Sequence, residues 1–213
     1  MPQTFKVGII GDGNVGTALT RGLTRAGHEV RSVGKEPAKV KEIATWADTL
    51  VLAVPFKEHE NALAEMGDAV KGKPLLDVTN VADDKLEYGL GLDKSGAERV
   101  QEKAKGAKVV KAFNTVFAQN MDTGRVHGER LTTFVAGDDA QAKQRALQFA
   151  RDIGFDAVDA GPLRNARWLE TLAILTMQLG YKQDLGPAIG FKLVHEGNVG
   201  ASAEGSATRE RTA

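Results

Sequence analysis

Residues 5–16 read FKVGIIGDGNVG, and this stretch decides the fold of the chain. A short apolar run leads into the spacing Gly11-x-Gly13-x-x-Gly16, and a helical pattern follows over residues 17–26. Gly11 can adopt the backbone angles of a sharp turn, Gly13 lets the main chain approach a pyrophosphate, and Gly16 lets the helix pack closely on the strand. Because unpaired N–H groups at a helix start attract anions, the stretch predicts a dinucleotide-binding strand, turn and helix.

The second strand, residues 28–33, follows soon after this helix, which favours dinucleotide binding over an ordinary glycine-rich turn. The residue at the end of that strand distinguishes NAD from NADP. An acid accepts the ribose 2′-OH of NAD, whereas small and basic residues accommodate the 2′-phosphate of NADP. Gly34 stands at this position and Lys35 and Lys39 follow it, so the sequence favours NADP. NAD stays the alternative, because Glu36 is acidic and exposed lysines are commonly only solvated surface.

The composition indicates an ordinary globular protein. Of 213 residues, 42% are hydrophobic, and 28 basic residues balance 28 acidic ones, so nothing in the charge indicates a nucleic-acid partner. No apolar run approaches the roughly 20 residues that cross a bilayer, and the N-terminus lacks the pattern of a signal peptide. We therefore expect no membrane insertion and a cytoplasmic location. The absence of cysteine excludes disulfides and thiolate metal sites.

Strand and helix patterns alternate from residue 5 to residue 160, which predicts an α/β fold with a Rossmann-type, doubly wound, mainly parallel sheet. The further strands are expected at residues 49–54, 73–80, 108–113, 131–136 and 156–160. The further helices are expected at residues 40–47, 59–70, 97–105, 116–121 and 140–153. Right-handed crossovers place the strand exits along one edge of the sheet, at Gly11, Gly34, Pro55, Thr79 and Asn114. Residues 82–96 show little periodicity and predict a long loop of the kind that often forms a lid.

The sequence predicts three segments: an NAD(P)-binding Rossmann domain over residues 1–161, a helical extension over residues 162–196 and a mobile tail over residues 197–213. Residues 163–181 form the longest helical pattern, and their apolar side chains cover more than one face. We therefore expect this helix to be largely buried and the protein to be a homodimer. The tail has almost no large apolar residue, so it cannot offset the entropy lost on ordering.

Other residues at strand ends are candidates for the cofactor site. The third strand stops at Pro55, and Pro55 and Phe56 are placed to touch a cofactor. The equally favoured alternative is that Pro55 only ends the strand and Phe56 caps the core. Asp77, Thr79 and Asn80 follow the fourth strand, where polar side chains orient a ligand or, somewhat more often, close a turn.

Four motifs together carry a family resemblance. They are GDGNVG at residues 11–16, AVP at 53–55, KAFNT at 111–115 and AGPLRNARWLE at 160–170. With them the chain resembles the deazaflavin-dependent NADP oxidoreductases. These are the coenzyme F-420:NADP reductases and their NADPH-dependent relatives, which include the cytoplasmic domain of the STEAP metalloreductases. The last two motifs are the most specific, and the resemblance extends to about residue 181.

The resemblance implies an enzyme that transfers a hydride between NADPH and a flavin-like small-molecule acceptor, namely the deazaflavin coenzyme F-420, FMN or FAD. It implies a substrate site at Phe113, Asn114 and Thr115. It implies a cofactor site which, together with the strand-end residues, comprises Gly11, Asp12, Gly13, Asn14, Val15, Gly16, Gly34, Lys35, Lys39, Ala53, Val54, Pro55, Phe56 and Asn80. Where the family commonly has Ser-Arg, this chain has Gly34-Lys35, so charge is kept while a hydroxyl and a bidentate guanidinium are lost.

No residue is assigned a catalytic role, because hydride transfer needs two rings held face to face rather than a nucleophile or a metal. The four histidines show no metal-ligand spacing, and His59, the one nearest the predicted cofactor edge, is interpreted as a solvated helix-start residue rather than a proton donor. One alternative is reduction of a small imine or carbonyl, for which Tyr88 and Tyr181, in a loop and at a helix end, offer no clear proton donor. Another is a protein that senses NADP(H) without turnover.

Overall fold

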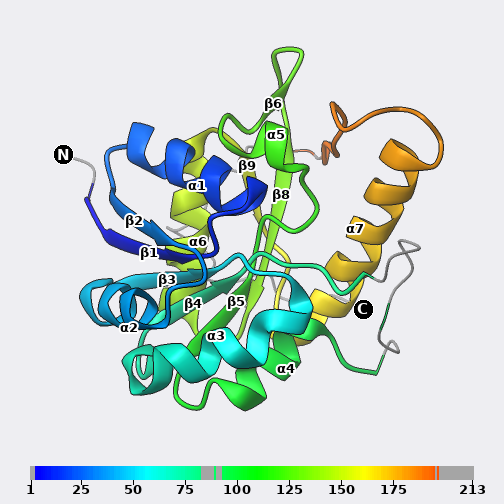
Figure 1. Ribbon diagram of the computed structural model, residues 1–213. Helices are drawn as coiled ribbons and strands as arrows, with labels where there is room; N and C mark the ends of the chain where they lie inside the picture. Colours follow the sequence, from blue (N-terminus) through cyan, green and yellow to red (C-terminus); the bar gives the residue numbers. More distant parts are fainter. Residues whose placement is uncertain (1–2, 83–88, 90–92, 195, 197–213) are drawn as a thin grey trace, which may run out of the picture.

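The computed structural model describes residues 3–82, 89, 93–194 and 196, and these residues form a sheet covered by helices on both faces (Figure 1). The sheet has seven strands in the order β2-β1-β3-β4-β5-β8-β9. These strands are β1 (Lys6–Ile10), β2 (Glu29–Val33), β3 (Thr49–Leu52), β4 (Pro74–Asp77), β5 (Lys108–Lys111), β8 (Thr132–Gly137) and β9 (Asp156–Asp159). The helices are α1 (Asn14–Arg25), α2 (Pro37–Trp46), α3 (His59–Met66), α4 (Gly96–Lys103), α5 (Ala118–Met121), α6 (Ala140–Ile153) and α7 (Ala166–Tyr181). Three 3-10 turns are η1 (Phe56–Glu58), η2 (Gly67–Val70) and η3 (Leu163–Asn165).

The predicted Rossmann-type fold is confirmed by the strand pairing. Strands β1 to β5 are parallel to one another, so their carboxyl ends meet at one edge of the sheet, as expected. The strand order reverses direction at β1, which has β2 on one side and β3 on the other. Strand β8 pairs with β5 in the antiparallel direction and β9 runs parallel to β8, so these two strands exit at the opposite edge. The sheet is therefore mainly parallel, and the crevice beside β1 is where such a sheet binds its ligand.

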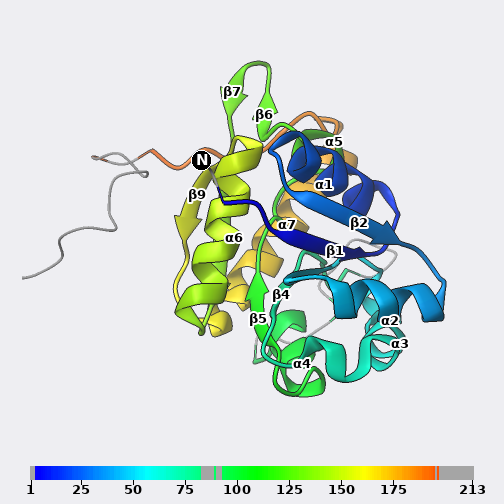
Figure 2. The same ribbon diagram turned by 90° about the vertical axis from the view of Figure 1, so that its left-hand side faces the viewer.

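The core lies on both faces of this sheet (Figure 2). One cluster of buried side chains joins α1 and α6 to the sheet, and a second joins α2, α3 and α4 to the other face. Leu163 and Ala166, from the start of the predicted extension, belong to the second cluster. The extension therefore begins inside the core of the sheet domain, and the boundary at residue 161 stays a prediction about domain organisation.

A small hairpin of β6 (Arg125–Val126) and β7 (Glu129–Arg130) was not expected from the sequence and projects from the molecule (Figure 2). Its strands are two residues long, which is too short for alternating hydrophobicity to show. Its turn is His127-Gly128, and both residues have positive φ, 48° and 84°. That backbone matches the turns that join two adjacent antiparallel strands, so the local turn geometry makes the hairpin.

Within the single chain the last helix is buried on one face only, and burial of its other face against a second subunit stays a prediction. Trp168 and Leu175 of α7 are 62% and 50% exposed. Seven residues separate them, so they lie on one outward face of the helix. The inward face is buried at Ala166, Leu169, Glu170, Ala173, Ile174, Thr176 and Gly180. The sequence showed apolar residues on several faces, but only contacts with the sheet domain decide which of them are covered.

Beyond α7 the chain runs without regular structure across α5 and β8. The Asn120 side chain donates hydrogen bonds to the carbonyls of Pro187 (2.9 Å) and Ile189 (3.2 Å), and the Thr132 amide donates to Phe191 (2.8 Å). The predicted extension is thus helical only as far as Tyr181. The predicted mobile tail and most of the predicted loop at 82–96 lie outside the described residues. No helix in the described ranges is long and apolar enough to span a membrane.

Candidate functional site

The ends of β1, β2 and β3 are joined at Gly11. The Gly11 amide donates to the Val33 carbonyl (2.8 Å), and the Ala53 amide donates to the Ile10 carbonyl (2.8 Å). Gly11 has φ 119°, and a Cβ built on it would lie 2.4 Å from the Ala53 carbonyl oxygen. Only glycine fits this backbone and this space. The tight turn therefore packs against the exit of β3, which brings Ala53 and Val54, both half-buried, next to the glycine motif.

Helix α1 begins at Asn14 with no side chain capping it, because its N-cap residue is Gly13. The first backbone bond of the helix runs from the Thr17 amide to the Gly13 carbonyl (2.9 Å). The amides of Asn14, Val15 and Gly16 thus lie in the first turn, where an α-helix leaves its N–H groups for an outside acceptor. A Cβ on Gly13 would meet nothing within 4 Å. This open, uncapped helix start fits a pyrophosphate, which supplies the acceptors that the helix lacks.

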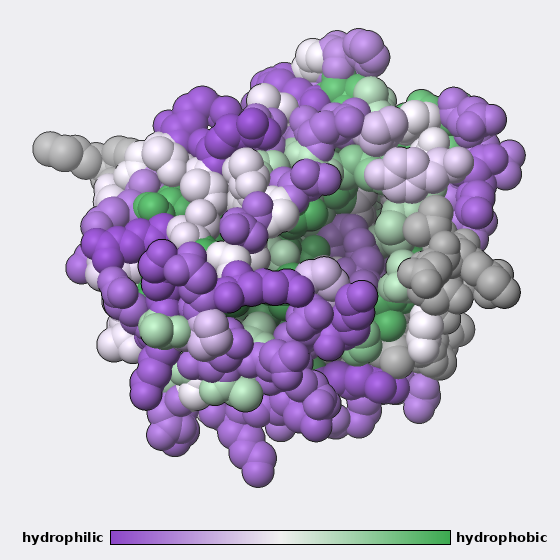
Figure 3. All heavy atoms as spheres, viewed as in Figure 1, coloured by the Kyte–Doolittle hydropathy of each residue, from purple (hydrophilic) through white to green (hydrophobic). Residues whose placement is uncertain are grey.

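A cavity of about 440 Å³ lies against this helix start. From the glycine motif and α1 it is lined by Asp12, Gly13, Asn14, Thr17 and Arg21, and from across the cleft by Phe117, Ala118, Gln119, Tyr181 and Pro187. The rings of Phe117 and Tyr181 meet edge to face, with centroids 5.1 Å apart. The face shown in Figure 3 is hollowed at its centre, and hydrophobic residues line much of the hollow. The cavity thus has polar and charged groups on the side of α1 and aromatic rings on the opposite side, an arrangement that suits a ligand with both phosphate groups and a flat ring system.

Seven residues of this cavity were not expected at the site, namely Thr17, Arg21, Phe117, Ala118, Gln119, Tyr181 and Pro187. Arg21 follows Thr17 by four residues, so the helical period was the one signal that placed it beside the glycine motif. Phe117 and Tyr181 come from distant segments, and no spacing in the sequence places them opposite α1. The sequence offered no clear proton donor in Tyr181, and the end of α7 brings this residue to the cavity.

The lysines expected near a 2′-phosphate are both paired with carboxylates on the surface. Lys35 Nζ lies 3.7 Å from Glu58, and Lys39 Nζ lies 2.6 Å from Glu36. The hydrogen bond and charge of Glu36 raise the pKa of Lys39 above its ordinary value. Exposed pairs of this kind are worth little, so both lysines can turn toward an anion at small cost. Their role as phosphate ligands stays a prediction.

The exit of β3 leads through the exposed Pro55 into η1. The half-buried Phe56 packs edge-on against His59, with ring centroids 4.9 Å apart, and its Cε2 atom lies 3.2 Å from the position of a Cβ on Gly96. Phe56 and His59 also line a second cavity, of about 580 Å³, between α3 and α4. Phe56 therefore has a packing role at the start of α4, and contact with a cofactor stays a prediction.

The exits of β4 and β5 are tied to α7 by two asparagines. Asn80 Nδ2 donates to the Asn114 carbonyl (2.8 Å), and Asn114 Nδ2 donates to Asn80 Oδ1 (2.9 Å) and to the Leu169 carbonyl (2.9 Å). Asn114 is 4% exposed, and its Oδ1 atom has no hydrogen-bond partner among the described residues. A buried acceptor left unpaired is costly, so this oxygen is a group that a ligand donor would satisfy.

The neighbours of Asn114 are placed differently. Phe113 has φ 61° and is 1% exposed, and its ring meets Phe155 edge to face in the core, with centroids 5.8 Å apart. Thr115 is 3% exposed. Of the three predicted substrate residues, the structure brings only Asn114 together with another predicted site residue, Asn80. The burial of the Phe113 side chain favours a role in the core over contact with a substrate.

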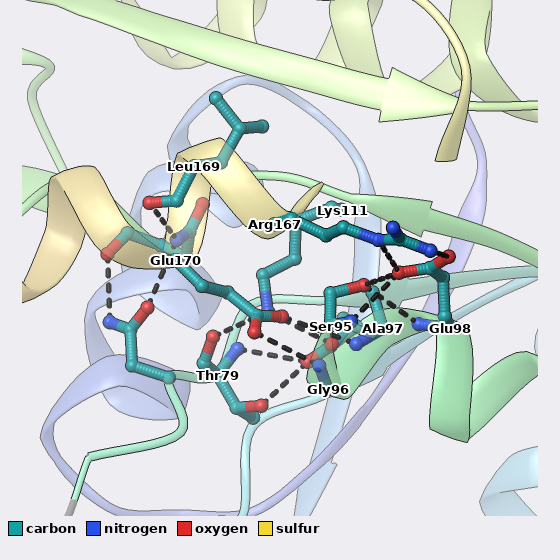
Figure 4. A network of polar contacts seen from close by, with 12 residues as sticks. Thr79, Ser95, Gly96, Ala97, Glu98, Lys111, Arg167, Leu169 and Glu170 are labelled. Atoms are coloured by element: carbon teal, nitrogen blue, oxygen red, sulfur yellow. Dashed lines mark hydrogen bonds and ion pairs between the residues drawn. The ribbon is translucent and has the colours of Figure 1, made fainter. Parts of the chain in front are cut away.

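Beneath these exits lies a buried ionic cluster that sequence reasoning missed (Figure 4). Lys111 Nζ contacts Asp77 Oδ2 (3.0 Å), Glu170 Oε1 (2.8 Å) and the Thr79 carbonyl (2.6 Å). The side chains of Lys111, Asp77 and Glu170 are all 0% exposed. Three acceptors match the three donors of an ammonium group. Lys111 interrupts an apolar strand, which was the one available signal of a buried charge.

Backbone and hydroxyl donors complete the cluster. Glu170 accepts from the amides of Gly96 (2.9 Å) and Ala97 (3.2 Å) at the start of α4, and Asp77 accepts from the Thr79 amide (3.0 Å) and hydroxyl (2.7 Å). Burial disfavours the charged forms of Lys111 and Asp77, but the ion pairs between the side chains stabilise these charges by more than burial costs. The carboxylates hold the pKa of Lys111 above its ordinary value, and Lys111 helps hold the pKa of Asp77 below its own. The positive, N-terminal end of the α4 helix dipole stabilises the carboxylate of Glu170.

Arg167 and Glu170 of the most specific motif thus attach α7 to α4. Arg167 donates two hydrogen bonds to Glu98, Nε to Oε2 (2.8 Å) and Nη2 to Oε1 (2.6 Å). Glu98 is also the third residue of a capping box with Ser95. Burial opposes ionisation of Glu98, but the bonds from Arg167 and Ser95 prevail and lower its pKa from 4.5 to about 2.

This shift predicts an acid-sensitive contribution to stability. The folded-state pKa of Glu98 is depressed, so the stabilisation is present above about pH 4.5 and is lost as the pH falls toward 2. Glu98→Gln should lower the free energy of unfolding at pH 7 by at most about 3 kcal/mol, and by less toward pH 2.5. The side chains of Glu98 and Arg167 are 18% and 30% exposed, and this partial exposure reduces the expected loss of unfolding free energy. Urea unfolding of both proteins at pH 7, 4 and 2.5 measures it, and a difference that does not change with pH would contradict the assignment.

The interpretation of His59 as a solvated residue is wrong. His59 begins α3 but is 4% exposed, and burial lowers its pKa, which favours the neutral ring. Among the described residues, neither ring nitrogen has a hydrogen bond of normal geometry, although the backbone of Val54 lies close enough to act on the pKa. The packing of α3 on the sheet domain, which the sequence did not show, buries this ring. Across the described ranges, no three histidine, aspartate or glutamate side chains gather as a metal site.

Comparison with known proteins gives concordant matches. The family profile described as "NADP oxidoreductase coenzyme F420-dependent" matches residues 6–81. The F420-dependent NADP reductase of Methanothermobacter marburgensis is 30% identical over 212 residues, which cover 84% of this chain and 93% of that protein. A structure from Arthrobacter sp. FB24, described as a candidate F420-dependent NADP reductase, superposes with a TM-score of 0.79 at 26% identity over 90% of this chain and all of that one.

The metalloreductase STEAP3 of Rattus norvegicus is also 30% identical, over 182 residues. That match covers 79% of this chain but 36% of STEAP3, so the chain spans about a third of the length of this relative.

Proposed function

Because this chain belongs to the family of F420-dependent NADP reductases, we propose that it transfers a hydride between NADPH and a deazaflavin of the coenzyme F420 type. The resemblance noted in the sequence is confirmed by these relatives. FMN and FAD are the alternative acceptors within the same chemistry. The hydride comes from the nicotinamide ring, and the protein has to hold that ring against the acceptor and keep water away.

The observation that carries the proposal is the uncapped start of α1 beside the 440 Å³ cavity. Free amides at Asn14 to Gly16 would hold the pyrophosphate, and the turn at Gly11 then directs the dinucleotide along the strand exits. Phe117 and Tyr181 form an apolar wall opposite this helix start. A site with one phosphate-binding end and one aromatic wall fits two flat rings better than a small polar substrate.

The roles of the strand-exit residues follow from their positions. Ala53 to Phe56 would line the nicotinamide end of the crevice, and Asn80 and Asn114 would stand beside the second ring. Asn114 offers a buried, unpaired Oδ1 acceptor at this edge. These residues would orient the rings and exclude water, and correct positioning supplies most of the rate in a hydride transfer.

Titration and turnover test the function together. The purified protein should bind NADPH and oxidise it when F420, FMN or FAD is added in turn, with a KM within about 1 μM to 1 mM for the true acceptor. Binding is followed by nicotinamide fluorescence and turnover by loss of absorbance of the reduced ring. Binding without turnover of any acceptor would contradict hydride transfer to a flavin-like ring and favour a sensor of NADP(H). If Asn114→Ala keeps its affinity for NADPH and loses turnover, the sensor alternative is excluded.

A second candidate function, reduction of a small imine or carbonyl, is favoured by one observation. The reaction needs a proton donor beside the acceptor carbon, and Tyr181 brings a phenolic hydroxyl to the cavity. A cyclic imine therefore belongs in the acceptor panel. Turnover of the imine alone would replace the first proposal by this one.

We also propose that the protein is a homodimer joined through the outer face of α7. Trp168 and Leu175 are exposed on this face, and the half-buried Leu172 and Leu179 complete an apolar stripe with spacing four, three and four. A large aromatic and leucine surface on one helix face is typical of a protein interface.

A further inference from the structure

The end of β2 carries a feature that bears on the choice between NADPH and NADH. A Cβ built on Gly34 would lie 2.5 Å from Asp12 Oδ2 and 2.7 Å from both Oδ1 and Cγ of the same side chain. Gly34 is not among the glycines with positive φ, so its backbone does not require glycine. The space at this strand end is taken by the Asp12 carboxylate, which reaches it from the glycine motif.

The Asp12 carboxylate is available to a ligand. Its oxygens take part in no hydrogen bond or ion pair within the described part of the chain, whereas the main-chain carbonyl of Asp12 accepts a hydrogen bond from the Thr17 hydroxyl (3.1 Å). Asp12 is exposed and also lines the cavity at the start of α1. The carboxylate therefore stands between the pyrophosphate position and the end of β2, where the ribose of the adenosine is held in this fold.

A carboxylate at this place favours one dinucleotide over the other. It accepts hydrogen bonds from the ribose 2′-OH of NADH, and it repels the 2′-phosphate of NADPH. The two lysines that would offset the repulsion can leave their exposed ion pairs at small cost, but the partner carboxylates of Glu58 and Glu36 add negative charge near the same strand end. The local charge is thus more balanced than a count of lysines indicates.

We propose that Asp12, packed against Gly34, is the residue that sets dinucleotide preference in this chain, and that it brings the affinities for NADPH and NADH to within about tenfold of each other. The proposal rests on the proposed function, because it assumes that the crevice beside β1 holds a nicotinamide dinucleotide. It differs from the choice that the sequence favours, NADP, because Gly34 does not leave an empty position. The Asp12 carboxylate, which comes from the glycine motif, occupies the place that an acidic residue at the end of β2 would otherwise take.

Asp12→Asn tests the charge without changing the shape. The ratio of the dissociation constant of NADH to that of NADPH, measured by fluorescence titration without any acceptor, should rise about tenfold. Asp68→Asn is the matched control. It removes the same charge from an exposed residue just before β4, at the opposite edge of the sheet, and should leave the ratio unchanged.

Gly34→Ala provides a second variant, because its methyl group must displace the Asp12 carboxylate. Introduced into the wild-type chain, Gly34→Ala should raise the ratio of the dissociation constant of NADH to that of NADPH. Introduced into the Asp12→Asn variant, it should change this ratio little, since the two residues act through one contact. Binding by wild type with a preference for NADPH above a hundredfold, or an unchanged ratio in Asp12→Asn, would overturn this inference while leaving the proposed function standing. Failure of wild type to bind either dinucleotide would overturn both.

Discussion

Replacing Lys111 by methionine should lower the free energy of unfolding by about 3–5 kcal/mol, because two carboxylates would be left in the core without their cation. Asp77 and Glu170 are fully buried, and Lys111 lies within 3.0 Å of both. Methionine fills much of the same volume, so the loss reports charge rather than a cavity. Each carboxylate keeps its backbone donors, which limits but does not remove the cost.

Urea unfolding at pH 7 measures this loss, and Lys71→Met is the matched control. Lys71 pairs with Asp68 on the surface, where the two side chains are 60% and 87% exposed, so the same substitution should cost less than about 1 kcal/mol there. The triple variant Lys111→Met, Asp77→Asn, Glu170→Gln should recover part of the loss, because neutral partners no longer need a cation. A loss below 1 kcal/mol for Lys111→Met alone would show that the cluster does not hold α7 to the sheet.

Gly16→Ala should abolish dinucleotide binding and destabilise the fold by about 2–4 kcal/mol. A Cβ on Gly16 would lie 1.9 Å from the Gly11 carbonyl oxygen, and backbone on both sides prevents an easy adjustment. Helix α1 would have to move away from β1, and the amides at its start would lose their position beside the strand exits. Fluorescence titration with NADPH and NADH should detect no binding by this variant.

Gly13→Ala separates binding from stability in the same motif. Its Cβ would meet nothing within 4 Å, so the free energy of unfolding should change by less than about 1 kcal/mol. Affinity for the dinucleotide should still fall at least about tenfold, because the methyl group would occupy the space of the pyrophosphate. Full affinity in Gly13→Ala would refute the placement of the phosphates, and full stability in Gly16→Ala would refute the packing of α1.

The sequence predicted the parts of the site that depend on local backbone. Gly11 and Gly16 are required by a turn and a close approach within six residues, so their spacing alone indicated the phosphate-binding helix start. The parallel strands β1 to β5 followed from apolar runs separated by helical periods, since that alternation leaves few topologies. The antiparallel direction of β8 was not predictable, because a strand pattern carries no record of the direction in which it pairs.

In the candidate site, too, the features that depend on local sequence were predictable and the contacts between distant segments were not. Asn80 and Asn114 were predicted at strand exits and do meet there, because parallel strands align their ends. Arg167 and Glu170 were recognised as part of a motif, but not as the residues that attach α7 to α4. Lys111 was interpreted only as part of a strand and of the KAFNT motif, not as a buried charge. A buried charge needs partners from other elements, and here those partners lie 34 and 59 residues away in the chain.

By itself, the sequence determined the Rossmann-type order of strands and helices, the phosphate-binding turn and the family. Local spacing and backbone requirements decide these features, and they act over a few residues. Tertiary structure alone decided that Asp12 fills the place beside Gly34, that Tyr181 faces the helix start, that His59 is buried, and that Trp168 lies outward. Each of these depends on which distant segments pack together, and packing depends on the shape and burial of the whole molecule rather than on the period of any one segment.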